Sequence, residues 1–239
     1  MHQGLLVVPP PEFGPAALAA FKHALAHLEE PVIGLPTGRT PIGLYKEMAR
    51  ERFAFPEGTR LFAIDEYCSP EPNDGTNAAF FARHLPSPPY PPVRVPRHDA
   101  SDPAAEIAAF SQAIEQMGGF DVAVLGIGIN GHIAFNEPGS SANTPGRTVV
   151  LTDSTRNQVV EEWGEPPTRG MTVGMAAVLS AQRLVLLASG AAKARILAAA
   201  LKGPATPDVP ASLLQNHPAL TVVCDSAAAA LLQRAPSSR

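Results

Sequence analysis

The sequence predicts an α/β fold, in which a mostly parallel β-sheet lies between two layers of helices. Short apolar runs alternate along the whole chain with segments that repeat apolar residues at helical spacing, and this alternation is typical of parallel strands joined by helices. The 239 residues, 45% hydrophobic and 17% charged, are enough for one large domain with a buried core. No shift in composition marks a boundary, so we expect residues 1–239 to form a single domain.

The first half of the chain begins with a helix rather than a strand in this interpretation. Apolar residues recur at helical spacing over 18–28, ahead of a first predicted strand, VIGL, at 32–35. A second amphipathic helix is expected over 42–48. LFAID at 61–65 predicts the next strand, and a helix follows at 75–85.

The second half continues the same alternation. The predicted strands are VRV at 93–95, DVAVLGIGI at 121–129, LVLLAS at 184–189 and LTVVCD at 220–225. The helices between them are expected at 104–117, 155–163 and 191–202. The 26 prolines lie between these segments, so they mark connections rather than disorder. Ligands of such sheets bind beyond the carboxyl ends of the strands, and the loops there are therefore expected to carry the chemistry.

Composition excludes several classes of function. A formal net charge of -4 argues against nucleic acid or an acidic membrane as the main partner. Two cysteines, Cys68 and Cys224, are too few for a disulfide scaffold and do not have zinc-site spacing. The chain shows no basic leader with an apolar core, and its longest apolar runs are far shorter than a membrane span. We therefore expect a cytoplasmic protein without a metal site.

The loop after the first predicted strand has the features of an anion site. It reads Pro36-Thr37-Gly38-Arg39-Thr40-Pro41. Thr40 is a suitable N-cap and Pro41 a suitable first helical residue, so free backbone N–H groups and a positive helix end would face this loop. Phosphate is the simplest such anion. The nucleotide-binding P-loop spacing is absent, and a plain strand-to-helix turn with a good cap is the alternative.

A second loop also has the features of an anion site at the start of a helix. Ser189 and Gly190 end a predicted strand, and Lys193 is expected in the first turn of the next helix. The helix dipole disfavours a cation at that end, so a bound anion would offset the cost.

Two carboxylates, Asp65 and Glu66, follow the strand at 61–65. A carboxylate at the carboxyl end of a strand is well placed to act as a general base. Neighbouring side chains of an extended chain point to opposite sides, so one of the pair is expected to face a ligand. The alternative is that both serve as helix-cap or turn carboxylates.

The strand that begins at Asp121 is followed by a literal Gly-x-Gly-x-x-Gly, at 126–131. A dinucleotide site would need a helix to open at the third glycine, and Pro138 and Gly139 come too early for a long helix. The same segment carries His132, five residues before Glu137. A histidine on a glycine loop can protonate a sugar oxygen, and a nearby carboxylate can set its tautomer and charge.

Taken together, five segments closely resemble the glucosamine-6-phosphate deaminases. They are GLPTGRTPIGLYKEM, AIDEY, GIGINGHIAFNEPGSS, MTVGM and LLQNHPALTVVCD, in order from about residue 30 to 225, and NGHIAFNEP is the most specific of them. The resemblance implies a Rossmann-like α/β domain that converts glucosamine 6-phosphate and water into fructose 6-phosphate and ammonium, a carbohydrate reaction of amino sugar catabolism. It also implies that no metal or organic cofactor takes part.

The resemblance also implies roles for individual residues. Asp65 would move a proton between carbons 2 and 1 through an enediol-like intermediate, and His132 with Glu137 would open the pyranose ring. Asn130 belongs to the same catalytic segment. The phosphate would be held by Thr37, Gly38, Arg39, Thr40 and Lys193.

Two departures from the family pattern bear on the substrate. Many members carry an aspartate where this chain has Asn130, so the pKa of the histidine is expected to be less elevated here. Glu161 stands where the family usually has an arginine that reaches the phosphate, and Arg39 stands where the family usually has a small residue. We expect Arg39 to replace the missing guanidinium.

Two other functions remain open at this point. A 6-phosphogluconolactonase-like hydrolase is favoured slightly by Asp65-Glu66 and by Asn73-Asp74-Gly75-Thr76-Asn77, whereas HIAFNEP argues against it. A phosphosugar-binding sensor could have lost catalysis through Asn130 and Glu161. The expected partner is a small sugar phosphate in each case, and the sequence leaves the oligomeric state open, a monomer included.

Overall fold

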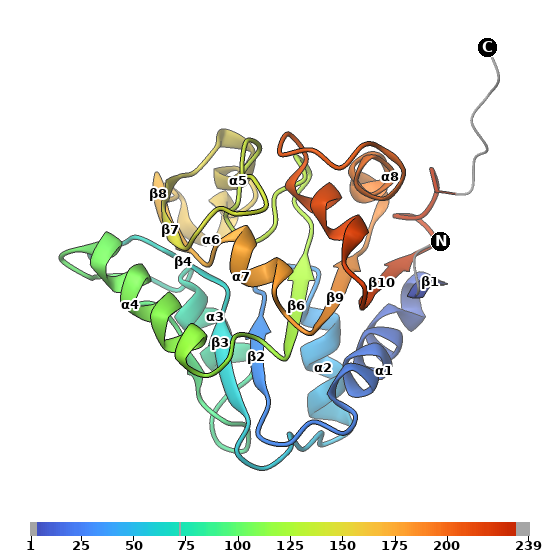
Figure 1. Cartoon of the computed structure of the whole chain (residues 1–239), viewed down its shortest axis with the longest axis horizontal. Coiled ribbons are helices and arrows are strands. Elements are labelled where there is room, and N and C mark those ends of the chain that lie inside the picture. Colours follow the sequence, from blue (N-terminus) through green and yellow to red (C-terminus); the bar gives the residue numbers. More distant parts are fainter. Residues whose placement is uncertain (1–3, 72, 233–239) are drawn as a thin grey trace.

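The central element of the fold is a parallel β-sheet with the strand order β1-β10-β9-β6-β2-β3-β5 (Figure 1). The computed structural model describes residues 4–71 and 73–232. The strands are β1 (Gly4–Val8), β2 (Val32–Leu35), β3 (Arg60–Ala63), β5 (Val93–Arg94), β6 (Val122–Gly126), β9 (Arg183–Ala188) and β10 (Leu220–Asp225).

Helices cover both faces of this sheet, which confirms the predicted three-layer architecture. One core contains residues of α1 (Phe13–Leu25), α2 (Ile42–Arg50) and α3 (Asn77–His84). The other contains residues of α4 (Pro103–Gln116), α7 (Met175–Leu179), α8 (Ala194–Lys202) and the 3-10 segment η3 (Pro210–Asn216). Along β6, Val122 and Val124 join the first core while Ala123 and Leu125 join the second. Burial on both faces explains why this strand is apolar without alternation.

A second, antiparallel sheet was not predicted. It consists of β4 (Asp65–Tyr67), β8 (Arg169–Thr172) and β7 (Arg147–Val150), in the order β4-β8-β7. The prediction of one strand over 61–65 is wrong, because the chain changes sheets at Ile64. The Ile64 N–H donates to Leu35 in the main sheet, and the Ile64 carbonyl accepts the Val173 N–H beside the small sheet. Asp65 therefore begins a new strand instead of ending an old one.

Three further boundaries differ from the predictions. The expected helix at 155–163 is two short helices, α5 (Asp153–Arg156) and α6 (Val160–Trp163), because Val159 between them has a non-helical ψ of 11° at φ -122°. Before α8, the chain forms the 3-10 turn η2 (Ala191–Lys193), so the expected helix at 191–202 is interrupted.

At the amino end, the strand β1 precedes α1 and the 3-10 turn η1 (Pro10–Glu12), whereas the sequence analysis placed a helix first. β1 is an edge strand with half-exposed apolar residues, a pattern that periodicity does not separate from a loop.

The strand order reverses between β2 and β6. After β2 the chain moves outward to β3 and β5, and it then returns to β6 on the other side of β2 before adding β9 and β10. Ligands of open α/β sheets bind at the carboxyl edge where the order reverses. The topology therefore points to the loops that follow β9, β6, β2 and β3, which are consecutive in the sheet.

We predict that Gly174→Ala disrupts the packing that starts α7. A Cβ at this position would lie 2.0 Å from the Thr144 carbonyl oxygen and 2.3 Å from the Pro145 carbonyl carbon, and backbone atoms cannot move aside cheaply. The expected loss is about 3 kcal/mol of unfolding free energy, measured by urea denaturation. Gly126→Ala is the matched control, because its Cβ would meet no atom within 4 Å. Equal stability of the two variants would contradict this account.

Candidate active site

Four loops that the sequence analysis selected lie at one edge of the sheet. Because β9, β6, β2 and β3 are neighbouring parallel strands, their carboxyl ends are side by side. These ends lead to Lys193, His132, Thr37 and Asp65 respectively. The Asp65 and His132 segments are further joined through β8: Thr172 is the register partner of Asp65, and its hydroxyl accepts the Phe135 N–H at 3.1 Å.

Asp65 is a buried carboxyl group with one strong hydrogen-bond donor. The residue is only 7% exposed, and its Oδ1 accepts a hydrogen bond from Asn77 Nδ2 at 2.6 Å. Burial raises the pKa of Asp65 to about 8, with a smaller contribution from the neighbouring charge of Glu66. A carboxyl group of this kind can both take up and release a proton near neutral pH.

Glu66 has a different task, although it follows Asp65 directly. Its carboxylate accepts the backbone N–H groups of Asn77 at 2.8 Å and Ala78 at 2.9 Å, at the start of α3, and that of Tyr67 at 2.7 Å. The residue is fully buried, and burial raises its pKa against the opposing effect of these donors. Glu66 therefore binds the start of a helix, which is the alternative prediction for this pair of carboxylates. Both Asp65 and Glu66 accept hydrogen bonds from Asn77.

His132 is connected to Glu137 through a threonine hydroxyl. Thr155 Oγ1 donates to Glu137 Oε1 at 2.5 Å and lies 3.1 Å from His132 Nδ1. Because the hydroxyl proton is directed to the carboxylate, the oxygen is left to accept the Nδ1–H of the imidazole. This arrangement selects one tautomer and leaves Nε2 available for proton exchange. The direct distance from His132 Nδ1 to Glu137 Oε2 is 3.6 Å.

Glu137 is held in its charged form. Burial by itself would raise its pKa, but interactions with His132, Thr155 and Asn130 bring it down to about 2. Asn130 Nδ2 donates to Glu137 Oε2 at 2.8 Å, and Thr152 Oγ1 donates to Oε1 at 3.2 Å. The amide at position 130 thus supports the carboxylate without adding a second negative charge. Sequence reasoning missed Thr152 and Thr155, because single hydroxyl residues carry no distinctive pattern.

Within the glycine pattern at 126–131, Gly128 lies against the imidazole of His132. A Cβ at Gly128 would lie 2.4 to 2.5 Å from three atoms of the His132 ring, so only glycine lets the ring lie against the backbone here. Gly131 has a φ of 89°, and the chain continues in turns with one isolated bridge between Ile133 and Asn136. No helix opens at the third glycine, as expected.

The predicted phosphate loop is connected to Asp65 through the side chain of Asn77. Thr37 Oγ1 donates to Asn77 Oδ1 at 2.8 Å, and Gly38 adopts a φ of 92° that favours glycine. The prediction that Thr40 caps α2 is wrong. Pro41 occupies the N-cap position, because its carbonyl accepts the first helical N–H, that of Tyr45. No side-chain hydrogen bond caps this end of α2.

Arg39 forms an ion pair with Glu161 of α6. The two side chains are 67% and 81% exposed, so the pair lies at the surface of the loop. The loop after β2 and helix α6, which are far apart in the sequence, therefore contact each other. On the same α6, Trp163 Nε1 donates to the Gly75 carbonyl at 3.1 Å, so the 153–163 segment spans from the His132 group to the loop before α3.

Lys193 ends the 3-10 turn η2 and is the N-cap residue of α8. It is half-buried, and this burial lowers its pKa. The turn is held by a hydrogen bond from the Gly190 N–H to Asp225 Oδ2 at 2.8 Å. α8 packs beside the histidine loop, since a Cβ at Gly131 would lie 3.1 Å from Ile196 Cδ1.

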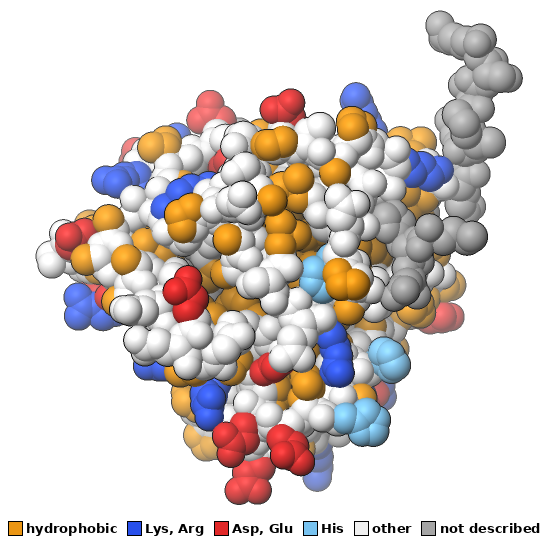
Figure 2. Space-filling model, in the orientation of Figure 1, with side chains coloured by type: hydrophobic (Ala, Val, Ile, Leu, Met, Phe, Trp, Pro, Cys, Tyr) orange, Lys and Arg blue, Asp and Glu red, His pale blue; other side chains and the backbone are white. Residues whose placement is uncertain are grey.

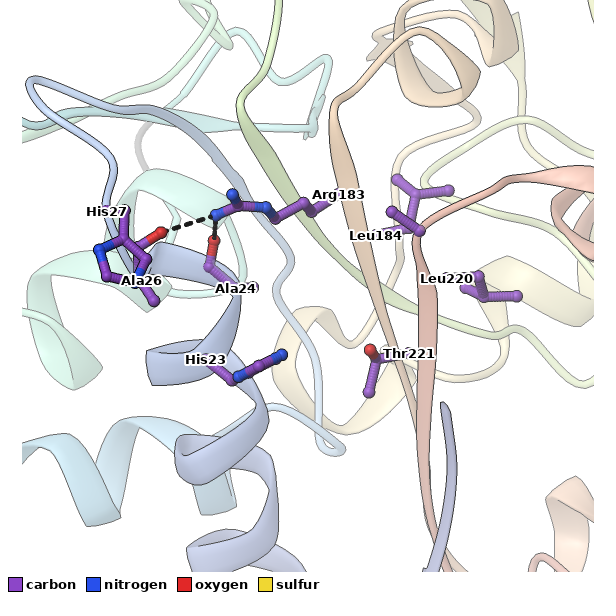
Figure 3. A pocket seen from close by; sticks show the side chains of 9 residues that line it. His23, Ala24, Ala26, His27, Arg183, Leu184, Leu220 and Thr221 are labelled. Carbon is purple, nitrogen blue, oxygen red and sulfur yellow. Dashed lines mark hydrogen bonds between the residues drawn. The ribbon is translucent and has the colours of Figure 1, made fainter. Parts of the chain in front are cut away.

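A pocket of about 420 Å³ lies at the opposite end of the sheet, where β9 and β10 begin (Figure 3). His23 and His27 line it together with Arg183, whose guanidinium donates to the carbonyls of Ala24 at 2.6 Å and Ala26 at 3.1 Å. Arg183 thereby satisfies the carboxyl end of α1, which is a structural task. This pocket is remote from the four loops by topology, and we do not assign the chemistry to it.

Charged side chains and side chains of metal-ligating types also occur outside the four loops. On the face drawn in Figure 2, Lys and Arg side chains are scattered among Asp and Glu instead of forming a broad basic area. Within residues 4–71 and 73–232, no group of three or more His, Cys, Asp or Glu side chains is arranged to hold a metal ion. Among those same residues, no helix has the length and apolar character to cross a membrane.

The chain is similar to proteins of known family. Residues 13–223 match the sequence model of the glucosamine-6-phosphate isomerases/6-phosphogluconolactonase family. A glucosamine-6-phosphate deaminase of Corynebacterium aurimucosum is 39% identical, with 84% of this chain and 83% of the relative aligned. One of Beutenbergia cavernae is 38% identical, with 97% and 93% aligned.

Solved structures agree. A monomeric glucosamine-6-phosphate deaminase superposes with a TM-score of 0.84 at 29% identity, covering 96% of this chain and 100% of that one. A 6-phosphogluconolactonase from Trypanosoma cruzi has a TM-score of 0.78 at 20% identity, covering 98% and 99%, and supports the fold alone. The relatives at 38% and 39% identity are both glucosamine-6-phosphate deaminases. With these relatives and a family match over most of its length, the chain belongs to the glucosamine-6-phosphate isomerase/6-phosphogluconolactonase family.

Proposed function

We propose that this protein converts glucosamine 6-phosphate and water into fructose 6-phosphate and ammonium. The observation that carries the proposal is the pairing of two proton-transfer groups at one sheet edge: a buried carboxyl group, Asp65, with a pKa of about 8, and the His132–Thr155–Glu137 relay. An aldose-to-ketose shift needs a base near carbon 2 and an acid near the ring oxygen. The names of the similar proteins favour the same reaction.

The first step assigned to the site is ring opening. Protonated His132 donates a proton from Nε2 to the ring oxygen as the bond between that oxygen and carbon 1 breaks, and Nε2 then takes up the proton that the hydroxyl at carbon 1 loses. The open-chain aldehyde forms and the imidazolium is restored. The charged Glu137 stabilises the imidazolium through Thr155 and keeps its orientation.

The second step moves hydrogen between carbons. Ionised Asp65 takes the proton from carbon 2 while protonated His132 gives one to the carbonyl oxygen at carbon 1, and an enolamine forms. Asp65 then delivers its proton to carbon 1, and carbon 2 becomes an iminium carbon. Water adds there, and the carbon–nitrogen bond breaks to give the ketose and ammonium.

The phosphate supplies binding energy at the far end of the sugar. We assign it to the loop that contains Thr37, Gly38, Arg39 and Thr40, and to Lys193 beyond the neighbouring strands. Binding at a non-reacting group orients the substrate over the two proton-transfer groups. No cofactor is required by this scheme.

The first prediction about activity concerns Asp65. In a coupled assay for fructose 6-phosphate, Asp65→Asn should lower kcat by about 10²- to 10⁴-fold, the usual contribution of a general base. Release of acid from 6-phosphogluconolactone without ammonium from the amino sugar would favour the hydrolase instead. Binding of the sugar phosphate without turnover by the wild type would favour a sensor.

The same variant should be more stable than the wild type at pH 7. The folded protein holds a proton on Asp65 up to a pKa of about 8, whereas the unfolded chain releases it near the ordinary value of 3.8. Stability is therefore lost as pH rises between these values, and asparagine removes that loss. Urea unfolding at about pH 4 and pH 7 should show a gain that grows with pH, and a constant difference would contradict the assigned pKa.

A second prediction tests the relay. Thr155→Val keeps the shape but removes the hydroxyl between His132 and Glu137, so kcat should fall about tenfold, the value of one hydrogen bond. Thr155→Ser should restore most of it. Identical turnover of the valine and serine variants would show that the hydroxyl does not support the imidazole.

A third prediction concerns Arg39 and Glu161. Arg39→Ala should raise KM for the sugar phosphate about ten- to hundredfold with little change in kcat, as expected for a charged hydrogen bond to phosphate. Glu161→Gln is the matched variant: it removes a carboxylate that holds Arg39 in the free protein, and KM should fall. An unchanged KM in Arg39→Ala would defeat the assignment.

A further inference from the structure

Asn77 lies between the predicted base and the predicted phosphate loop. Its side-chain Nδ2 donates to Asp65 Oδ1 at 2.6 Å and to the Asp65 carbonyl oxygen at 2.9 Å, and its Oδ1 accepts the Thr37 hydroxyl at 2.8 Å. The residue is 3% exposed and is the first of α3, with its own N–H bound to Glu66. One buried amide therefore contacts two loops that neighbouring strands bring together.

The orientation of this amide follows from its partners. The backbone carbonyl of Asp65 accepts hydrogen bonds in every protonation state, so the NH₂ end of Asn77 must face Asp65. The oxygen end then faces Thr37, whose hydroxyl can donate. A flipped amide would place its oxygen against two acceptor atoms of Asp65, which is unfavourable.

This orientation makes the two oxygens of Asp65 unequal. Oδ1 faces an N–H donor at 2.6 Å and so has no room for a proton of its own on that side. Among the described residues, the hydrogen bond to the Asp65 carboxyl group goes to Oδ1, and a carboxyl proton would therefore reside on Oδ2.

We propose that Asn77 is a positioning residue that reserves Oδ2 of Asp65 as the atom carrying the proton between carbons 2 and 1. The inference rests on the proposed function and extends it to a residue outside the set selected from the sequence. The Thr37 hydroxyl donates to the oxygen of the same amide, so Asn77 fixes the position of the Thr37 loop relative to Asp65.

Other ionisable groups face Asp65 and remain in any Asn77 variant. Glu66 adjoins it on β4 and raises its pKa, and Tyr45 of α2 faces it with a hydroxyl whose own pKa is raised by burial and by Asp65. His98 acts on Glu66. A change in the pH profile of Asn77→Ala is therefore attributable to loss of the amide, which lowers the pKa of Asp65.

The test compares Asn77→Ala and the isosteric Asn77→Asp with the wild type. Both should lower kcat about tenfold, for the lost hydrogen bond, and shift the acid limb of kcat/KM to higher pH. The shift should be larger for Asn77→Asp, because a third carboxyl group joins Asp65 and Glu66.

Thr76→Ala is the control, because it removes the cap that accepts the Ala79 N–H at 3.2 Å on the same helix without a bond to Asp65. It should lower the unfolding temperature and leave the pH profile in place. Unaltered kcat and pH limb in both Asn77 variants, or an equal shift in Thr76→Ala, would overturn the positioning role.

A second measurement separates this inference from the proposed function. The carboxyl carbon of Asp65, followed by NMR titration of the protein without substrate, should titrate at higher pH in both Asn77 variants than in the wild type. If the wild type releases no fructose 6-phosphate, the proposed function fails whatever the titration shows. If the wild type is active and the Asp65 titration is unmoved, the inference about Asn77 fails alone.

Discussion

The bond between the Glu66 carboxylate and the amino end of α3 is the constraint on which the site depends. Glu66 is fully buried and accepts three backbone N–H groups, two of them from the first turn of that helix. Because a buried carboxylate without such donors would be costly, β4 and α3 can pack only in this arrangement. The arrangement sets Asn77 beside Asp65, so Glu66 determines the surroundings of the carboxyl group next to it.

The surroundings of Asp65 and of Glu137 favour opposite protonation states, although both residues lie at the same edge of the sheet. Around Asp65, burial and a neighbouring carboxylate favour the protonated form, whereas around Glu137 three donors favour the charged form. The first environment suits a group that exchanges protons, and the second suits a group that supports a charged imidazole. The first environment is made by burial and a neighbouring carboxylate, and the second by hydrogen-bond donors, and these neighbours lie close in space to the groups that they affect.

The 153–163 segment connects the His132 group to the loop that contains Arg39. Thr155 at its start contacts His132 and Glu137, and Glu161 near its end pairs with Arg39 of the phosphate loop. An exposed ion pair of this kind is worth at most about 1 kcal/mol, so an anion can displace it easily. Arg39 and Glu161 thus form one feature: a cation in the loop and a carboxylate that contacts it.

Much of the architecture could be anticipated from local patterns. Buried parallel strands read as apolar runs, helices as periodic segments, and the segment around His132 as a specific motif, because each depends on residues close together in the chain. The change of sheet at Ile64, the threonine relay at Thr155 and the amide of Asn77 could not, since each joins residues that are 12 to 109 positions apart. A hydroxyl or an amide is common everywhere in a sequence, and it acquires a function from the atoms that folding places within hydrogen-bond distance.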